Sequence, residues 1–209
     1  MIQPERFIRE HLRLAPVTGV PGVELYQAHS GSRLSRLGSE AAPYWAYAWG
    51  GGVVLAQYLQ AHPELVVGRR VLDLGAGSGL VGIVAAQLGA TVSAAEVDPF
   101  GQAAIRINAV ASGVAVALLS VDIDGAPPDG FELILGGDVF YLREVAVRML
   151  SFLQRCQAAG VDVLIGDPQR RDLPVAALEP VFQTTVTDMG GVEREAGVYR
   201  LRDPHPASP

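Results

Sequence analysis

The chain has 209 residues, of which 49% are hydrophobic and 18% charged, and its formal net charge is −6 at pH 7. This balance excludes a disordered chain and favours one globular domain with a sizeable core. It also argues against a nucleic-acid partner, because neutralising phosphates requires a basic face. All 16 basic residues are arginines, so the chain contains no lysine.

A single cysteine, Cys156, cannot form an internal disulfide. It falls on an apolar-periodic helical segment, where we expect a small core residue in a reducing compartment. No stretch reaches the roughly 18 uninterrupted apolar residues of a membrane span. The first residues also lack the apolar segment of a secretory signal. We therefore expect a cytoplasmic protein, monomeric and without a membrane partner.

The first third of the chain predicts two helices, one strand and one loop. Apolar spacing predicts a helix over residues 4–14, and a strand is expected over 23–27. Residues 30–40 are rich in Ser, Gly and Arg and are typical of a mobile loop. An aromatic-rich segment that starts at Tyr44 then leads into a helix ending near residue 62.

From residue 70 onward the pattern alternates between strands and helices, which predicts a parallel sheet covered by helices. The expected elements are strand 70–74, helix 79–88, strand 91–96, helix 99–112, strands 115–121 and 131–137, helix 143–159, strand 161–166, a short helix 174–179, and strands near 181–188 and 197–202.

The last two strands are joined by a turn at Gly190-Gly191 with no helix between them, so one of them should run antiparallel. The predicted fold class is therefore α/β. We expect a Rossmann-like seven-strand sheet, mostly parallel, with one antiparallel strand near the C-terminus and helices on both faces. Residues 1–209 are expected to form a single domain, with a core over 41–202 and a flexible tail over 203–209.

A glycine-rich loop follows the strand at 70–74. Gly75, Gly77 and Gly79 alternate and then open an amphipathic helix. Glycine permits tight turns and a close approach of backbone to a ligand. The helix N-terminus that follows offers unpaired N–H groups and a positive dipole end. The sequence therefore predicts a cofactor loop.

Two cofactor classes compete for this loop. Residues 77–82 satisfy the dinucleotide pattern G-x-G-x-x-G, which is a weak signal in a chain with 24 glycines. Asp73 ends the preceding strand. A carboxylate there would repel a pyrophosphate but would pair with a cationic amino-acid group. S-adenosylmethionine carries an ammonium and a sulfonium, so Asp73 favours it.

Further acidic residues follow the next two predicted strands. Glu96 lies 17 residues beyond Gly79, near the spacing at which an acid reaches ribose hydroxyls. Asp98 precedes a proline and is expected to cap a helix. Asp122 follows the strand after that and could accept a hydrogen bond from an adenine amino group.

The segment after the strand at 131–137 combines small residues with an acid and a phenol. Asp138 and Tyr141 lie three residues apart, just beyond the strand end. The carboxyl ends of parallel strands meet at the ligand-binding edge of such a sheet. The spacing alone is equally compatible with an Asp that caps the helix at 143 and a Tyr that packs on it.

These residues resemble a known family, the class I, seven-strand S-adenosylmethionine-dependent methyltransferases. More narrowly, they resemble the electron transfer flavoprotein β-subunit lysine methyltransferases in their bacterial form. The segments that carry the resemblance are Pro43 to Gly51, Val71 to Gly79, Glu96 to Phe100, Gly137 to Tyr141 and Gly166 to Pro168.

The resemblance implies roles for particular residues on the cofactor side. Asp73 and the glycines at 75, 77 and 79 would hold the methionine end of S-adenosylmethionine. Glu96 would hold its ribose and Asp122 its adenine. Trp49 would pack against the cofactor, whereas Trp45 is expected to be a core aromatic.

On the acceptor side, Asp138 and Tyr141 match the Asp-x-x-Tyr motif that contacts the substrate lysine. The resemblance implies that Asp138 captures and orients the ammonium, without assigning it as the general base, and that Tyr141 lines the lysine channel.

The implied reaction is methylation of a protein lysine, on the electron transfer flavoprotein β subunit or on a ribosomal protein such as L7/L12. Two alternatives remain open: a small-molecule N-methyltransferase with the same cofactor site, and a nicotinamide-dinucleotide-binding oxidoreductase. No metal site is expected, because the sequence has no H-x-x-x-H, no paired cysteines and no histidine cluster.

Overall fold

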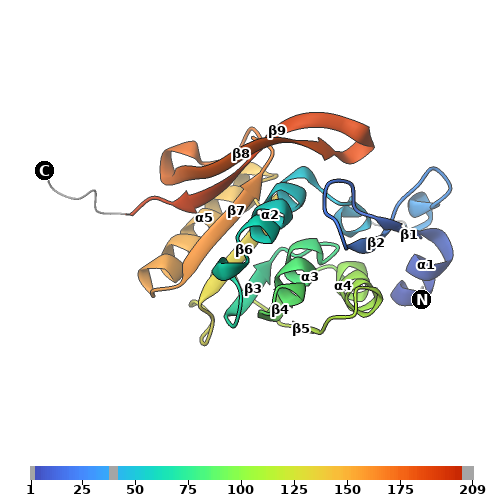
Figure 1. Cartoon of the computed structure of the whole chain (residues 1–209), viewed down its shortest axis with the longest axis horizontal. Coiled ribbons are helices and arrows are strands. Elements are labelled where there is room, and N and C mark those ends of the chain that lie inside the picture. The colour runs from blue at the N-terminus through green and yellow to red at the C-terminus, as the bar shows by residue number, and fades with distance from the viewer. Residues whose placement is uncertain (1–2, 38–41, 204–209) are drawn as a thin grey trace, which may run out of the picture.

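The computed structural model describes residues 3–37 and 42–203. A seven-stranded sheet has the order β5-β4-β3-β6-β7-β9-β8 (Figure 1). Its first five strands are parallel, and β9 runs antiparallel to both β7 and β8. The predicted fold class is confirmed. The strands are β3 Arg70–Leu74, β4 Thr91–Ala95, β5 Val116–Leu118, β6 Leu133–Gly137, β7 Asp162–Asp167, β8 Leu178–Asp188 and β9 Val192–Leu201.

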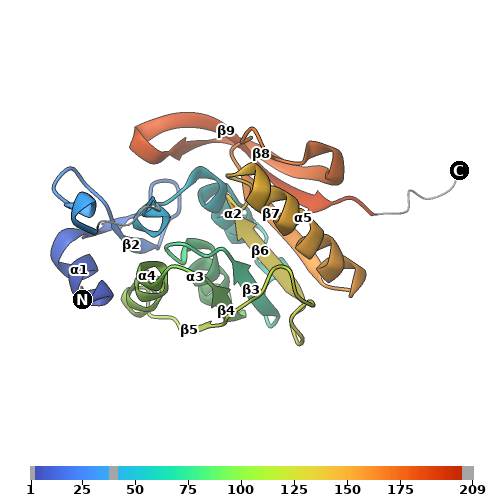
Figure 2. The same cartoon turned by 180° about the vertical axis from the view of Figure 1, so that it is seen from behind.

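Helices cover both faces of this sheet (Figures 1 and 2). Successive strand residues point to opposite faces, so Leu133 and Leu135 of β6 pack in one core with α2 and α3. Ile134 packs in the core on the other side, with α5. The helices are α2 Gly50–Ala61, α3 Leu80–Gln87, α4 Pro99–Ala111 and α5 Arg143–Ala158.

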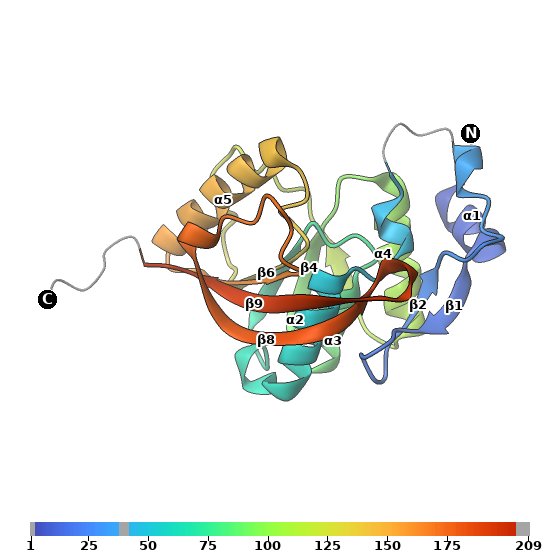
Figure 3. The same ribbon diagram turned by 90° about the horizontal axis from the view of Figure 1, so that it is seen from above.

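The N-terminal segment lies at the end of the molecule opposite α5 (Figure 3). It forms α1 Pro4–His11 and a two-stranded hairpin of β1 Arg13–Pro16 and β2 Glu24–Gln27. The predicted helix over 4–14 is therefore wrong at its C-terminal end. Residues 13–16 pair with β2, and this ladder replaces the helical hydrogen bonds that the apolar spacing suggested.

The loop predicted over 30–40 contains a short 3-10 helix, η1 Leu34–Leu37, and residues 38–41 lie outside the described residues. A second 3-10 turn, η2 Tyr44–Ala46, leads into α2 as expected. Trp45 is buried in a cluster with α1 and α4, which confirms its predicted core position.

Two C-terminal predictions need correction. The strand expected over 115–121 is only the three residues of β5. The helix expected over 174–179 is a 3-10 turn, η4 Val175–Ala177, because β8 already begins at Leu178. Leu178 pairs with Leu201 of β9, and this strand pairing shortens the helix.

Other local predictions are confirmed. The Asp98 side chain accepts the Phe100 N–H at 2.8 Å and caps α4. Cys156 is buried on α5. The turn between β8 and β9 uses Gly190 and Gly191, both with positive φ. Within the described residues, no helix is both long and apolar enough to cross a membrane.

Candidate functional site

The glycine loop lies at the carboxyl end of β3 and leads into α3. Gly75, Gly77 and Gly79 all have positive φ, between 53° and 85°. Side chains rarely adopt this backbone, which explains the three alternating glycines. A Cβ at Gly77 would meet nothing within 4 Å, so the middle of the loop faces open space.

Asp73 lies beneath this loop with only 1% of its surface exposed. Its Oδ2 accepts the Gly82 N–H, in the first turn of α3, at 2.8 Å. Burial raises the pKa of Asp73 to about 7, against the effect of the Gly82 hydrogen bond. The structure therefore places Asp73 as a buried acid that ties β3 to the start of α3.

Glu96 is the acid that contacts the glycine loop directly. Its Oε2 accepts the Gly77 N–H at 2.8 Å and its Oε1 accepts the Asp98 N–H at 2.9 Å. A carboxylate has about four acceptor positions, so each oxygen retains capacity for another donor. Glu96 is half-buried, and this position fits the predicted role of accepting ribose hydroxyls.

Asp122 lies in an exposed turn beyond β5. Its Oδ1 accepts the Asp124 N–H at 2.9 Å, and its carbonyl accepts the Gly125 N–H. These hydrogen bonds stay within its own turn, so Asp122 is placed less firmly relative to the loop than Glu96.

Asp138 joins the end of β6 to the start of α2. Its φ is 57°, a left-handed conformation that is uncommon for a non-glycine residue. Its Oδ2 accepts the Gly51 N–H at 2.6 Å and the Gly52 N–H at 3.2 Å. The interpretation of Asp138 as the cap of the helix at 143 is wrong, because the N-cap of α5 is Leu142. Asp138 caps α2 instead.

The backbone of α2 approaches the strand ends unusually closely. A Cβ at Gly166 would lie 2.0 Å from the Gly51 carbonyl oxygen, and one at Gly137 would lie 2.8 Å from the Gly52 Cα. Only glycine fits at such distances. This contact was not predicted from the sequence, although the three glycines at 50–52, Gly137 at the end of β6 and Gly166 near the end of β7 indicate it.

A second carboxylate, Asp188 at the end of β8, also reaches the N-terminus of α2. Its Oδ1 accepts the Gly50 N–H at 2.9 Å, and Arg194 lies 3.3 Å from its Oδ2. The unpaired N–H groups of a helix start attract negative charge. Asp138 and Asp188 therefore hold this helix end from two strands. The sequence analysis did not single out Asp188.

Arg170, also missed, pairs with Asp138. Its Nε donates to Asp138 Oδ1 at 2.7 Å, and its Nη2 lies against the same oxygen. Burial raises the pKa of Asp138, and the Arg170 guanidinium acts in the opposite direction. The segment Gly166 to Pro168 carried part of the family resemblance, and Arg170 follows it by two residues.

Three aromatic side chains, those of Trp49, Tyr44 and Tyr141, form one cluster beside Asp138. The Trp49 indole donates to the Tyr44 carbonyl at 2.7 Å. The Tyr44 ring lies 5.1 Å from the Tyr141 ring and 5.5 Å from the Trp49 ring, between centroids. Burial raises the pKa of Tyr141, and the charges of Tyr44 and Glu96 add to this effect. The segment that carries Tyr141 adjoins the glycine loop, since a Cβ at Gly75 would lie 3.3 Å from Val139 Cγ1.

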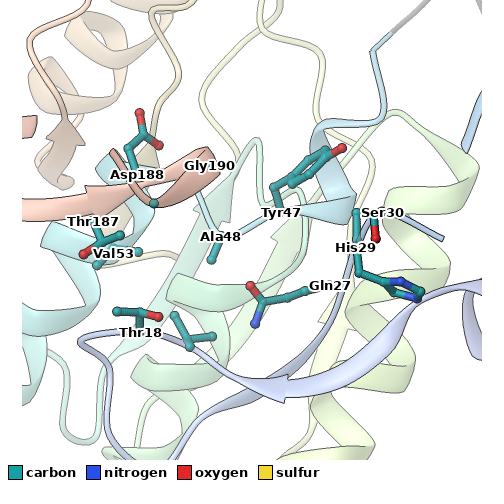
Figure 4. Close-up of a pocket in the computed structure, with 13 residues that line it drawn as sticks. Thr18, Gln27, His29, Ser30, Tyr47, Ala48, Val53, Thr187, Asp188 and Gly190 are labelled. Carbon is teal, nitrogen blue, oxygen red and sulfur yellow. The ribbon is translucent and has the colours of Figure 1, made fainter. Parts of the chain in front are cut away.

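A groove of about 560 Å³ lies between the N-terminal hairpin, the segment before α2 and the β8–β9 hairpin (Figure 4). Thr18, Gln27, Tyr47 and Thr187 contribute to its lining. Asp188 also lines it, so the groove reaches the helix end that Asp138 caps. None of the predicted cofactor residues lines it, and the groove is therefore separate from the glycine loop.

Solved structures with a similar fold include methyltransferases. The tRNA (uracil-54, C5)-methyltransferase of Pyrococcus abyssi, solved with S-adenosyl-L-homocysteine, matches 71% of this chain and 38% of its own, with a TM-score of 0.52 and 18% identity. The ribosomal protein L11 methylase of Lactobacillus delbrueckii matches 72% of this chain and 79% of its own, with a TM-score of 0.50 and 21% identity. The fold is thus that of the Rossmann-like methyltransferases.

The family is narrower than this fold. Residues 42–182 match the family described as lysine methyltransferase. The chain belongs to this family, which confirms the resemblance seen in the sequence.

Curated relatives include the electron transfer flavoprotein β-subunit lysine methyltransferases of two vertebrates. The Danio rerio protein is 42% identical over 131 residues, which cover 61% of this chain and 51% of the relative. The Xenopus laevis protein is 37% identical over 153 residues, which cover 70% and 62%. The chain therefore matches only about half to three fifths of the length of these relatives.

Proposed function

We propose that the protein is an S-adenosylmethionine-dependent protein-lysine N-methyltransferase. The observation that carries this proposal is the meeting of two motifs at one edge of the sheet. The Glu96 carboxylate, after β4, holds the glycine loop that follows β3, and the Asp-x-x-Tyr segment follows β6, which pairs with the other side of β3. A Cβ at Gly75 of the loop would lie 3.3 Å from Val139, inside that segment. Membership of the lysine methyltransferase family supports the same reaction.

We assign the cofactor side to the residues predicted from the sequence. Glu96, with its remaining acceptor capacity, would hold the ribose. The backbone of Gly75, Gly77 and Gly79, which faces open space at Gly77, would lie along the methionine end, and Asp73 would support it from below. Trp49 and Asp122 complete the proposed set. When bound, S-adenosylmethionine supplies a methyl group on a positively charged sulfur, and the S–C bond breaks as an amine lone pair forms the N–C bond.

The acceptor side has to position a neutral amine. The unperturbed pKa of lysine is about 10.4, so only about one amine in 2,500 is neutral at pH 7. Holding the reactants in line can supply about 7–11 kcal/mol of the barrier. We assign the alignment of the lysine amine to the segment that contains Asp138 and Tyr141. The Tyr44 and Trp49 rings would line the same channel.

The shape of this region supports a macromolecular acceptor. Tyr141 is 41% exposed, and the groove beside Asp188 is open along the same helix end. By analogy with the names of the curated relatives, we propose the electron transfer flavoprotein β subunit as the substrate. Ribosomal protein L7/L12 is a further candidate. A cytoplasmic location and a monomeric state are parts of the same proposal.

The test incubates the protein with labelled S-adenosylmethionine and the purified β subunit, followed by mass spectrometry of the labelled peptides. We expect methylated lysine in the β subunit. The enzyme itself contains no lysine, so methyl-lysine cannot arise from its own chain. L7/L12 is run in parallel.

Two controls separate the alternatives. Label that enters small molecules of a cell extract but no protein would overturn the protein-substrate assignment. Calorimetry with S-adenosylmethionine and with NAD checks the cofactor. Binding of NAD in preference to S-adenosylmethionine would overturn the cofactor assignment.

A further inference from the structure

Arg170 is held in place by the turn that follows β7. Its backbone N–H donates to Asp167 Oδ1 at 2.7 Å, and Asp167 is completely buried. Gln169, between them, has a φ of 57°, in the left-handed region. A buried acceptor and an uncommon backbone conformation thus fix the direction in which the Arg170 side chain leaves the turn.

The Arg170 guanidinium lies between an acid and an indole. Its Nε donates to Asp138 Oδ1, its Nη2 forms an ion pair with the same oxygen, and its central carbon is 5.4 Å from the centroid of the Trp49 ring. A guanidinium over an indole face adds a cation–π attraction to the ion pair. The side chain of Arg170 is 26% exposed and that of Asp138 is 10% exposed.

This arrangement engages both oxygens of Asp138. Oδ2 accepts two N–H groups from α2, at Gly51 and Gly52, and Oδ1 accepts the Arg170 Nε–H and forms an ion pair with Arg170 Nη2. The guanidinium therefore balances the charge of the carboxylate at close range. An ammonium that arrives beside Asp138 would therefore meet a carboxylate whose charge is already compensated.

We propose that Arg170 is a positioning residue that compensates the Asp138 charge, so that the acceptor lysine loses its proton more readily than it would beside a free carboxylate. This inference rests on the proposed lysine methylation. A nearby carboxylate favours the charged form of an amine, and a nearby cation disfavours it. By pairing with Asp138, Arg170 thus weakens the effect of that carboxylate on the pKa of the acceptor lysine.

Other ionisable groups face the pair from neighbouring elements. Glu96 faces the site from the end of β4, and Tyr44 and Tyr141 face it from η2 and from the segment after β6. Asp188 lies beside Asp138 and is paired with Arg194 of β9. Asp167 lies at the end of β7, where burial raises its pKa to about 7. The Arg170 guanidinium lowers the pKa of Asp138 and of Asp167, so its loss raises both, and the lysine titration is therefore read from the alkaline part of the profile.

The experiment compares kcat/KM for the β subunit across pH 7 to 10.5 in wild type and Arg170→Gln. We expect the variant profile to move upward by about one pH unit. The rate near pH 7 would then fall about tenfold and recover toward wild type at high pH, since one pKa unit changes the neutral fraction tenfold. Arg170→Lys keeps the charge, and its profile should lie close to that of the wild type.

The neighbouring residue offers a matched control. Arg171 is 90% exposed and lies 3.6 Å from Asp172. Arg171→Gln removes the same charge one residue away and should leave the profile in place. Cofactor affinity and thermal unfolding are measured for every variant.

A second substitution covers the case in which Arg170→Gln fails to fold. Arg170→Met removes the same charge and keeps a long apolar side chain beside the Trp49 indole. Its profile should also move upward, and an unchanged midpoint would contradict the inference.

Two further results would overturn the inference. A loss of equal size at every pH would mean that Arg170 is only structural. A lower KM in Arg170→Gln would mean that Arg170 blocks the lysine and must move aside. If the wild type methylates no lysine, the proposed function fails first, and that result is visible before any variant is made.

Discussion

The carboxylate of Asp138 closes the N-terminus of a helix that lies 87 residues earlier in the chain, since its Oδ2 accepts the Gly51 N–H at 2.6 Å. The Asp-x-x-Tyr segment is thereby fixed to the helix that carries Trp49 at its N-cap. Asp138 thus has a structural role that its place in a substrate motif does not reveal.

Asp138→Ala is expected to abolish methyl transfer and to leave S-adenosylmethionine affinity within a few-fold of wild type. It should also lower the free energy of unfolding by about 3 kcal/mol, because it leaves Arg170 partly buried without its partner. Activity, calorimetry and urea unfolding check the three parts. An equal loss of cofactor binding would contradict the assignment of Asp138 to the acceptor side.

Gly166→Ala tests the close contact between β7 and α2. The added Cβ would lie 2.0 Å from the Gly51 carbonyl oxygen, so backbone has to move. We expect the free energy of unfolding to fall by about 1–3 kcal/mol. Gly52→Ala is the control, because its Cβ would meet Leu80 at an ordinary 3.6 Å. Urea unfolding should show little loss, or a small gain, for Gly52→Ala; equal losses would show that the close contact does not matter.

Glu96→Ala tests the cofactor loop. Removing the acceptor of the Gly77 N–H should weaken S-adenosylmethionine binding by at least tenfold, the loss of about 1.4 kcal/mol of hydrogen bonding. Asp122→Ala should weaken it less, because Asp122 is exposed and bonds within its own turn. Calorimetry measures both constants. The ranking of these two acids fails if Asp122→Ala has the larger effect.

Asp73 gives the fold a distinctive pH dependence. Burial raises its pKa to about 7 in the folded chain, against about 3.9 when unfolded. Between these values the folded state binds more protons than the unfolded state, so stability falls as pH rises from about 4 to about 7. The contribution of this one group is up to about 4 kcal/mol.

Asp73→Asn keeps an acceptor for the Gly82 N–H but cannot ionise, so it should lose less stability than wild type between pH 5 and pH 8. Asp124→Asn is the control, because its hydrogen bond with Arg148 lowers the pKa of Asp124 and moves its titration below this window. Urea unfolding at both pH values decides the matter. Parallel slopes for wild type and Asp73→Asn would show that Asp73 stays ionised in the folded chain.

Much of the fold could be predicted because its signals are local. The alternation of strands and helices after residue 70 is visible in the sequence because each element has its own spacing of apolar residues. The strands and helices of the parallel sheet follow that spacing. The Asp98 cap likewise needs only two neighbouring residues. The end of α1 was misjudged because β1 pairs with β2, a partner farther along the chain.

The candidate site was predictable only in part. Glu96 and the glycine loop could be predicted, because each directly follows an apolar strand and the alternating glycines are visible in the sequence. Arg170, after β7, pairs with Asp138, and Asp188, at the end of β8, accepts the Gly50 N–H of α2; no spacing between neighbouring residues predicts these contacts. Their roles depend on the order of strands in the sheet.

The bond from Asp188 to Gly50 has a consequence for how the molecule is assembled. Chains are synthesised from the N-terminus, so α2 and the glycine loop emerge well before β8. Until β8 arrives, the first amide of α2 lacks its carboxylate partner. A nascent chain halted before that strand would thus carry the glycine loop but lack one of the two carboxylates at the start of α2. Under the proposed function, methyl transfer would begin only after the last hairpin has formed.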